Sequence, residues 1–170
     1  EGQSITLVYI DSTQGWINTM DSTSNVRGNA YMVATGGCIT TCGNDKIHKF
    51  NAPGTFTVCT AAICAANNLV SYMVVAGGGG GGCAYGGGGG GSYGGGGGAG
   101  GYRETKSPVT PYTASPLCGY ATPGNRITVT ATGYPIAVGG GGTGGPFPSG
   151  PYQGGTGAVS TFSTISSAGG

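Results

Sequence analysis

The chain has 170 residues, of which 41 are glycine, and charged residues make up only 6% of it, with a formal net charge of +1. Soluble domains usually carry roughly 25% charged residues, and nucleic-acid binders cluster their cations, whereas the six Lys and Arg residues here are spread thinly. One histidine and five carboxylates give few acid–base pairs. We therefore expect no nucleic-acid partner, no enzymatic activity and no cofactor.

The first 29 residues are predicted to form an N-terminal hairpin and a linker. Residues 5–10 and 16–18 are rich in β-branched and aromatic residues and flank a polar turn, which is typical of two paired strands. Residues 21–29 lack apolar periodicity and are predicted to be a loop or linker. The expected domains are therefore 1–29 and 30–170.

From residue 31 the strand pattern resumes. Short strands are expected at 31–35, 38–42, 46–50, 55–60, 69–76, 126–132, 134–138 and 159–165. Phe56 and Val58 alternate with polar residues, as in a sheet with one covered face, and only residues 60–68 could hold a short helical turn. The longest apolar run, 69–76, is too short to cross a bilayer, so no membrane insertion is expected. The predicted fold class is all-β and sandwich-like.

Two glycine-rich tracts interrupt the strands, at 77–101 and, more weakly, at 139–157. A flexible linker is the ordinary interpretation, because ordering the 19 glycines of the first tract costs on the order of 20–40 kcal/mol. Its runs of six, six and five glycines, separated by tyrosine-bearing segments, favour instead extended rods of the polyproline II type that bond laterally. Turns between these rods are expected at 83–85 and 92–93.

The segment that begins with residues 72–77, continues through the first glycine tract and ends with residues 98–103 resembles the glycine-rich domain at the distal ends of bacteriophage tail-fibre proteins, of the marine or cyanobacterial phage type. Further segments share the similarity: 46–50, 53–58, 127–129, 134–139 and 163–165. Residues 6–16 are similar to a hairpin that recurs in trimeric fibre segments. The resemblance implies a homo-oligomer in the virion with no catalytic or metal-binding residue, and with only three clear rods, several chains are expected to combine.

Tyrosines in glycine- or proline-rich loops are the candidate receptor-binding residues, because an amphipathic ring contacts sugars or proteins at low entropy cost. They are Tyr85, Tyr93, Tyr102, Tyr112 and Tyr152. The competing interpretation is that these rings pack over the glycine rods. The expected function is a phage tail-fibre adhesin, on the virion, that binds a bacterial surface glycan or outer-membrane protein; the alternative is a subunit of an extracellular filament or matrix.

An even number of cysteines makes disulfides a candidate feature. The six are Cys38, Cys42, Cys59, Cys64, Cys83 and Cys118. If the arms around a turn at 51–54 are antiparallel, Cys42 faces Cys59 and Cys38 faces Cys64, which leaves Cys83 with Cys118. Disulfides would suit an extracellular protein; free buried thiols and a zinc site that could include His48 are the alternatives, and no metal is expected.

Overall fold

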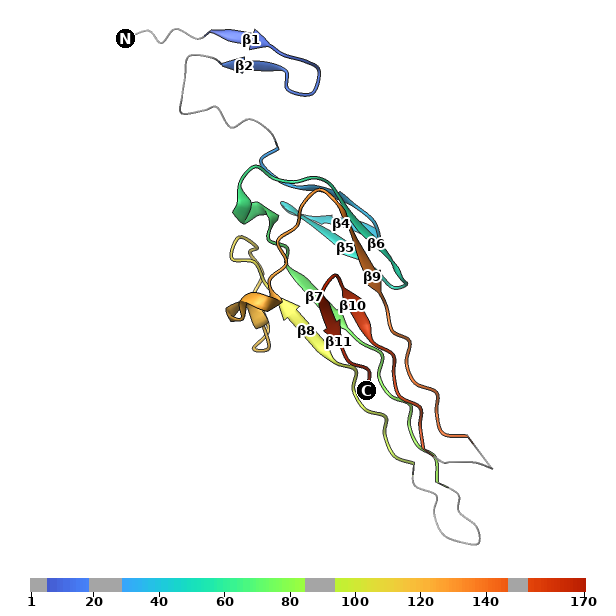
Figure 1. Cartoon of the computed structure of the whole chain (residues 1–170). Helices are drawn as coiled ribbons and strands as arrows, with labels where there is room; N and C mark the ends of the chain where they lie inside the picture. The colour runs from blue at the N-terminus through green and yellow to red at the C-terminus, as the bar shows by residue number, and fades with distance from the viewer. Residues whose placement is uncertain (1–5, 19–28, 85–93, 147–152) are drawn as a thin grey trace.

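The computed structural model describes residues 6–18, 29–84, 94–146 and 153–170, and this part of the chain is all-β, as predicted (Figure 1). The strands are β1 (Leu7–Tyr9), β2 (Trp16–Asn18), β3 (Val33–Thr35), β4 (Cys38–Cys42), β5 (Asp45–Lys49), β6 (Gly54–Thr60), β7 (Tyr72–Val75), β8 (Tyr102–Thr105), β9 (Gly133–Ala137), β10 (Ser160–Phe162) and β11 (Ile165–Ser167). Three 3₁₀ turns join them, at Ala65–Asn68, Gly119–Ala121 and Pro123–Asn125. No helix in the described part is long and apolar enough to span a bilayer.

Strands β1 and β2 form the predicted N-terminal hairpin. Their antiparallel register sets Tyr9 opposite Trp16, with ring centroids 5.4 Å apart. Asp11 holds the turn, because its Oδ1 accepts hydrogen bonds from the backbone N–H groups of Thr13 (2.8 Å) and Gln14 (2.7 Å), a bonding pattern common for aspartate in turns. Each strand has only three residues, so few backbone bonds hold the hairpin together.

The largest sheet is antiparallel and has the order β11-β10-β9-β6-β3. In β6 the predicted alternation is confirmed, since Phe56 and Val58 are buried whereas Thr55 and Cys59 are exposed. Strands β3 and β11 form the two edges of the sheet. Because Phe56 and Val58 lie on the same face of β6, this face of the sheet is the one that a second layer covers.

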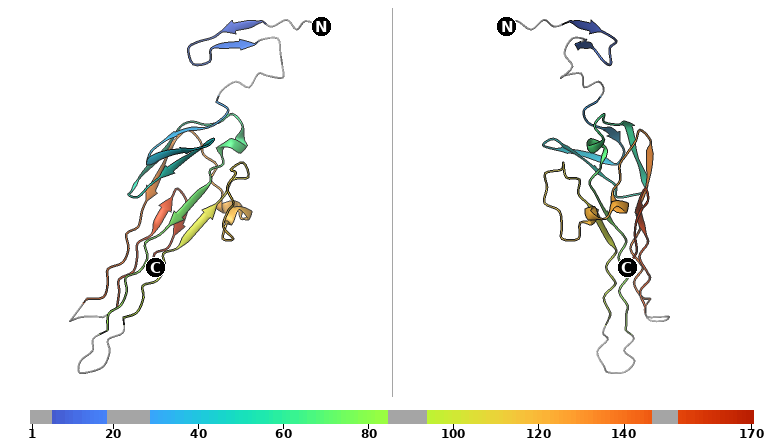
Figure 2. Two further views of the ribbon diagram at one scale, coloured as in Figure 1. Left: turned by 180° about the vertical axis from the view of Figure 1, so that it is seen from behind. Right: turned by 60° about the vertical axis from the view of Figure 1, so that its left-hand side comes forward.

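The second layer includes the β7–β8 hairpin, which packs on the sheet at β10 and β11 (Figure 2). The rings of Tyr72 and Phe162 meet edge to face at 5.7 Å, and the Ser167 hydroxyl donates to the Val74 carbonyl at 3.0 Å. The buried apolar core lies between these elements and consists of Phe56, Val58, Val74, Ile127, Val129, Phe162 and Ile165. Burial of this core is the main stabilising contribution available to so weakly charged a chain.

The structure corrects three details of the predicted strands. Residues 126–132 are not a strand, although Ile127 and Val129 enter the core; one isolated bridge joins Leu69 to Thr128 there. Residues 159–165 are not one strand, because β10 ends at Phe162, the backbone reverses, and β11 begins at Ile165. Strand β8 has no predicted counterpart, since its sequence Tyr-Arg-Glu-Thr lacks apolar alternation.

Five strands continue directly into glycine-rich segments that run side by side away from the sandwich (Figure 2). We name these segments rod 1 (77–82, after β7), rod 2 (94–101, before β8), rod 3 (139–146, after β9), rod 4 (153–158, before β10) and the C-terminal segment (168–170, after β11). Together they form what we call the glycine bundle.

Candidate binding surface: the glycine bundle and the Glu104 cluster

Rod 1 is bonded to rod 2 with a period of three residues. Every third N–H group, beginning just before rod 1, donates to every third carbonyl of rod 2, which runs antiparallel. These bonds join Ala76 to Gly101 (2.9 Å), Gly79 to Gly98 (2.8 Å) and Gly82 to Gly95 (2.9 Å). A β-strand would repeat every two residues, whereas three residues per turn is the repeat of the polyproline II helix. Two of the three predicted polyglycine II-like rods, at 77–82 and 94–98, are therefore present.

The other two rows of backbone groups on rod 1 bond to rods 3 and 4. Gly77 and Gly80 donate to rod 4, at Ala158 (3.0 Å) and Gly155 (2.8 Å), and rod 3 donates to Gly78 and Gly81 from Gly142 and Gly145 (both 2.8 Å). Rod 1 thus lies at the centre of the bundle, with each row of its groups facing a different neighbour. The bundle is assembled within one chain, which corrects the expectation that several chains combine to form it.

Rods 3 and 4 and the C-terminal segment complete the lattice. Rod 4 donates to rod 3 from Ala158 to Gly140 (2.8 Å) and from Gly155 to Thr143 (2.7 Å). Gly170 donates to Gly77 (3.0 Å) and accepts from Gly157 (2.8 Å), and Ala168 accepts from Gly101 (2.7 Å). Lateral hydrogen bonds therefore satisfy many backbone groups that a polyproline II segment cannot satisfy internally.

Glycine is required at the contacts between rods because the backbones touch. A Cβ atom added at Gly97 would collide with the Gly79 carbonyl, and one added at Gly154 would collide with the Gly80 carbonyl. On the outer face, Gly96 and Gly140 have no atom within 4 Å of such a Cβ. The bundle therefore excludes side chains from its interior and tolerates them outside.

One end of the bundle lies distant from the sandwich (Figure 2). Gly82 bonds to Gly95, and Gly81 bonds to Gly145, so rods 1, 2 and 3 end together. At this end the Cys83 thiol donates to the Pro146 carbonyl at 3.0 Å. Three predicted receptor-binding residues, Tyr85, Tyr93 and Tyr152, lie outside the described residues, as do the glycine run 86–91 and the turn expected at 92–93.

At the opposite end of rod 2, a cluster of polar side chains surrounds Glu104 on strand β8. Glu104 is buried as a residue (7% exposed), and its carboxylate accepts hydrogen bonds from the Tyr102 hydroxyl (3.0 Å), the Ser115 backbone N–H (3.1 Å) and the Ser115 hydroxyl. The Ser115 hydroxyl bond is the largest factor that lowers the pKa of Glu104, against the opposing effect of burial. An ionised carboxylate thus ties the loop at Ser115 to β8.

Tyr112 belongs to the same cluster, so the structure brings together Tyr102 and Tyr112, two of the predicted receptor-binding residues. Burial, followed by the charge of Glu104, raises the pKa of Tyr112 to about 12, so its hydroxyl stays protonated at neutral pH. The Lys106 ammonium lies 5.8 Å from the Tyr112 ring centroid. Both tyrosine rings remain partly exposed (36% and 41%), so they can still contact a partner.

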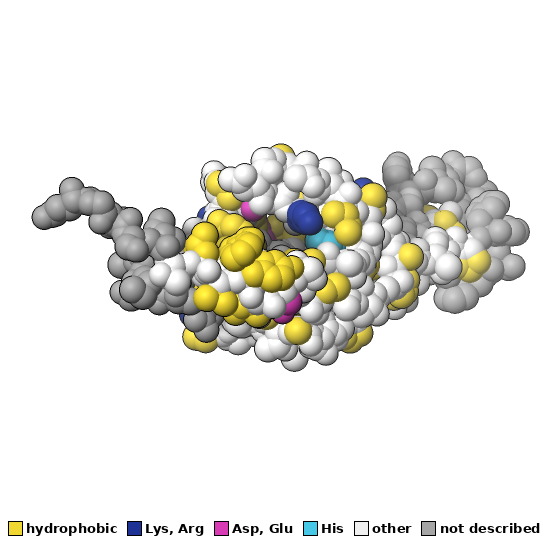
Figure 3. All heavy atoms as spheres, turned by 90° about the horizontal axis from the view of Figure 1, so that it is seen from above, with side chains coloured by type: hydrophobic (Ala, Val, Ile, Leu, Met, Phe, Trp, Pro, Cys, Tyr) yellow, Lys and Arg dark blue, Asp and Glu magenta, His cyan; other side chains and the backbone are white. Residues whose placement is uncertain are grey.

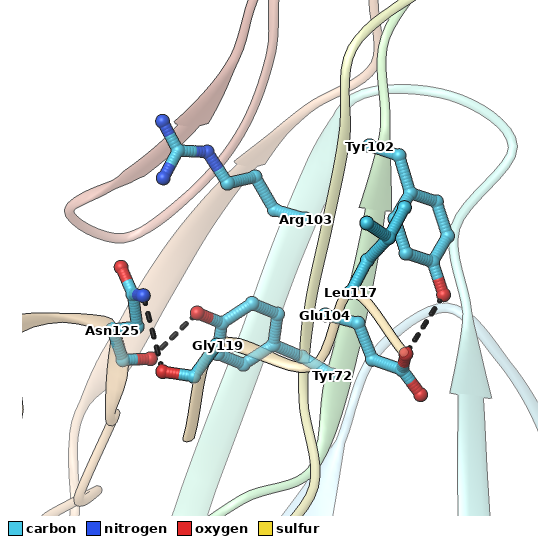
Figure 4. A pocket seen from close by; sticks show the side chains of 7 residues that line it. All are labelled: Tyr72, Tyr102, Arg103, Glu104, Leu117, Gly119 and Asn125. Atoms are coloured by element: carbon cyan, nitrogen blue, oxygen red, sulfur yellow. Dashed lines mark hydrogen bonds between the residues drawn. The ribbon is translucent and has the colours of Figure 1, made fainter. Parts of the chain in front are cut away.

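A hollow of about 350 Å³ lies beside this cluster, between β8 and the loop that returns along it (Figure 4). It is lined by Tyr72, Tyr102, Arg103, Glu104, Leu117, Gly119 and Asn125. Its far wall is fixed by hydrogen bonds from the Tyr72 hydroxyl to the Asn125 carbonyl (2.6 Å) and from the Asn125 amide to the Gly119 carbonyl (3.1 Å). Arg103 and Glu104 point in opposite directions from successive positions of β8, and the Glu104 carboxylate is directed toward Tyr102 (Figure 4). Among these groups, the Arg103 guanidinium and the Tyr102 ring are the ones that a partner can still reach.

Sequence patterns did not single out Glu104 or Ser115. They lie 11 residues apart, and a short irregular loop separates them. The available signal was the rarity of carboxylates, because Glu104 is one of only five in the chain and sits on a strand next to a tyrosine-bearing loop. Rare charged groups in such a chain are candidates for specific bonding.

All six cysteines are free thiols in the structure, so the predicted disulfide pairs are not formed. The prediction required the arms around residues 51–54 to pair, but β5 pairs with β4, and β6 pairs with β3 and β9. Cys38 and Cys42 consequently lie opposite Lys49 and Asp45. The sulfur of Cys118 instead accepts a hydrogen bond from the Lys106 N–H at 3.4 Å, and Cys83 bonds within the bundle as described above.

His48 has a structural position. Its Nδ1 lies 2.8 Å from the Gly36 carbonyl oxygen, and its ring meets Phe56 edge to face at 5.0 Å. No group of three or more potential metal-ligating side chains occurs in the described ranges. His48 thus helps to seat the β4–β5 hairpin on the sheet.

A β-sandwich whose strands continue into a bundle of glycine-rich rods defines a glycine-rich structural module. Residues 51–170 match the family model of a glycine-rich domain, and the chain belongs to this family. No curated protein and no solved structure matches it. The family match begins within the turn before β6 and therefore covers the whole bundle and most of the sandwich.

Proposed function

We propose that the chain is the receptor-binding tip of a bacteriophage tail fibre, an adhesin that recognises a glycan or protein on a bacterial surface without covalent chemistry. The observation that supports this most is the three-residue hydrogen-bond period of rod 1, which joins three other rods into one column. A column bonded along every row of its central rod is a rigid support. Rigid support lowers the entropy cost of ordering binding loops.

The residues proposed to contact the receptor fall into two groups. Tyr85, Tyr93 and Tyr152 belong to the connections between rods, and Tyr102 and Tyr112 belong to the Glu104 cluster. Because the chain carries so few charges, recognition would rely on ring stacking and hydroxyl hydrogen bonds. This chemistry fits a sugar-bearing surface.

Binding to intact bacteria tests the proposal. Fluorescently labelled chain is titrated onto a panel of strains, with surface polysaccharide purified from the bound strain as competitor. Gly97→Ala and Gly96→Ala form a matched pair, since only the Gly97 position meets another rod. We expect Gly97→Ala to lower stability by about 3 kcal/mol, as overpacking does, and to weaken cell binding, whereas Gly96→Ala should bind normally.

Two further results bear on the proposal. Antibodies raised against the chain should label the tips of tail fibres on virions in electron micrographs. Absence of binding to every strain would contradict the adhesin role, and saturable binding that survives loss of the bundle in Gly97→Ala would contradict the role of the bundle as its support. Long filaments of purified chain without cell binding would favour the extracellular-filament alternative.

A further inference from the structure

The C-terminal segment lies in a groove that rods 1, 2 and 4 form together. Gly170 donates to the Gly77 carbonyl of rod 1 (3.0 Å) and accepts from the Gly157 N–H of rod 4 (2.8 Å). The Ala168 carbonyl accepts from the Gly101 N–H of rod 2 (2.7 Å). The segment reaches only part of the way along the bundle (Figure 1). It is therefore a fourth neighbour of rod 1 near the sandwich but not further out.

The groove continues past Gly170, away from the sandwich, and we call this continuation the distal groove. It is a hollow of about 280 Å³, lined by Gly170, by glycines of rods 1 and 2, and by residues 153–156 of rod 4. A Cβ atom added at Gly98 would lie 3.3 Å from Gly170. One added at Gly95, three residues further out on the same row of rod 2, would have no atom within 4 Å. The row of rod 2 that faces the C-terminal segment thus goes on to face the distal groove.

Backbone groups of all three rods face the distal groove. They lie one three-residue repeat beyond the groups that bond the C-terminal segment: the Gly80 carbonyl on rod 1, the Gly98 N–H on rod 2 and the Gly154 N–H on rod 4. None of the three makes a hydrogen bond within the described residues. Because a polyproline II rod repeats every three residues, they point into the distal groove as their equivalents point at the C-terminal segment. The distal groove therefore offers one acceptor and two donors to a further turn of the same kind.

The C-terminal segment also shows which side chains the groove admits. A Cβ atom added at Gly169 would collide with the Gly157 carbonyl, and one added at Gly170 would lie 2.5 Å from the Ala99 carbonyl oxygen. Ala168, in contrast, carries a side chain and is exposed. A segment bound in this groove therefore follows the repeat Xaa-Gly-Gly, with a side chain allowed only at the first position of each repeat.

We propose that the distal groove binds an extended Xaa-Gly-Gly segment of another polypeptide. The segment runs parallel to the C-terminal segment in the polyproline II conformation, donates to the Gly80 carbonyl and accepts from Gly98 and Gly154. Of the described residues that line the groove, none is charged or aromatic, so backbone bonding selects the partner. Charged side chains are likewise few and scattered on the face seen in Figure 3. This site is separate from the receptor contacts proposed above, so either proposal can fail while the other holds.

Binding of a short peptide to the full-length chain, followed by NMR, tests the proposal. On titration with an acetylated and amidated Ser-Gly-Gly-Ser-Gly-Gly peptide, the amide signals of Gly98 and Gly154 should shift and saturate. The signal of Gly142, which donates to Gly78 from rod 3 (2.8 Å), should not move. The peptide Ser-Ala-Gly-Ser-Ala-Gly should bind about tenfold more weakly, because its alanines overpack the groove. The absence of saturable shifts at Gly98 and Gly154, or equal binding of the two peptides, would overturn the proposal.

A matched pair of variants locates the site. Gly95→Val places a side chain in the distal groove, and Gly140→Val places the same side chain on rod 3, outside the groove; neither Cβ position has an atom within 4 Å. Gly95→Val should bind the Ser-Gly-Gly peptide about tenfold more weakly than the native chain, and Gly140→Val should bind it equally well. An unchanged melting temperature of both variants shows that the side chain acts on the groove and not on the fold. If Gly95→Val binds the peptide as tightly as the native chain, the site is elsewhere and the proposal is wrong.

Two further measurements separate a partner polypeptide from other occupants of the groove. If the native chain associates in sedimentation experiments and Gly95→Val does not, a second copy fills the groove and the proposal is wrong. In the second measurement, Ser-Gly-Gly-Ser-Gly-Gly is appended after Gly170, and exchange protection of the Gly98 amide is compared with that of the native chain. If the appended residues protect Gly98 while the free peptide does not bind, the groove accepts only a covalent continuation, which equally contradicts the proposal.

Discussion

Glu104 shows how one side chain can organise a loop in a chain with few charges. Its carboxylate accepts bonds from Tyr102 and from both the backbone and the hydroxyl of Ser115. Hydrogen bonds to an ionised group are stronger than those between neutral groups. The partly exposed tyrosines of this cluster are therefore held by a group whose charge depends on pH.

Glu104→Gln should lower stability at neutral pH by about 1–3 kcal/mol, the usual cost of weakening bonds to a charged group. The folded-state pKa of Glu104 is lowered, so its stabilising contribution is complete above the unfolded-state pKa of roughly 4.3 and is lost as the pH falls through the folded-state value. Denaturant unfolding of both proteins as a function of pH measures this. The difference in the free energy of unfolding between the native chain and Glu104→Gln should shrink on acidification. An equal difference at all pH values would contradict the stabilising role of the Glu104 charge. Asp45→Asn, outside the cluster, is the control.

Among the elements, the β10–β11 hairpin has a turn whose first residue, Ser163, adopts a backbone conformation that is unfavourable for any residue except glycine. Phe162 pairs with Ile165, which leaves Ser163 and Thr164 in the turn, and Ser163 has φ +52°. A two-residue turn with positive φ at its first position favours glycine there. Ser163→Gly should raise the free energy of unfolding by about 1 kcal/mol, whereas Thr164→Gly should lower it by about 0.4–1 kcal/mol. Thermal unfolding measures the stability of both variants. If Ser163→Gly and Thr164→Gly changed the free energy of unfolding equally, the turn assignment would be wrong.

The sequence predicts those elements in which side chains alternate. Strand β6 is predictable because Phe56 and Val58 must share a face, and the N-terminal hairpin because polar residues separate two apolar runs. Strand β8 cannot be predicted in this way, because only its pairing with β7 makes it a strand. The predicted cysteine pairs were wrong because they also depended on strand pairing. A chain reversal at residues 51–54 does not specify which strands become neighbours.

At the scale of the whole molecule, the rods could be predicted but their partners could not. Runs of glycine favour the three-residue helix, yet without side chains they carry no pattern that fixes register. The register comes from the strands that continue into them, because β7, β8, β9 and β10 are already aligned in the sandwich. Likewise, Tyr102 and Tyr112 could be named as candidates, but only the fold brings them to Glu104.

Because strands and rods are continuous, we expect the sandwich and the bundle to unfold as one unit. Bonds also cross their junction, where Gly139 donates to the Ser160 hydroxyl at 2.9 Å. Ile165→Val removes one methylene from the core and should cost about 1 kcal/mol. That cost should lower the exchange protection of the Gly80 amide, deep in the bundle, about fivefold.

Amide exchange followed by NMR measures this coupling. Val58 donates to Thr132 within the sandwich, and its protection should fall in Ile165→Val by the same factor as that of Gly80. Gly96, whose N–H makes no hydrogen bond within the described residues, should exchange rapidly in both proteins and serves as the reference. If Val58 loses protection while Gly80 keeps it, the lateral bonds of the bundle hold without the sandwich. The glycine rods would then fix their own register, contrary to the view that the strands impose it.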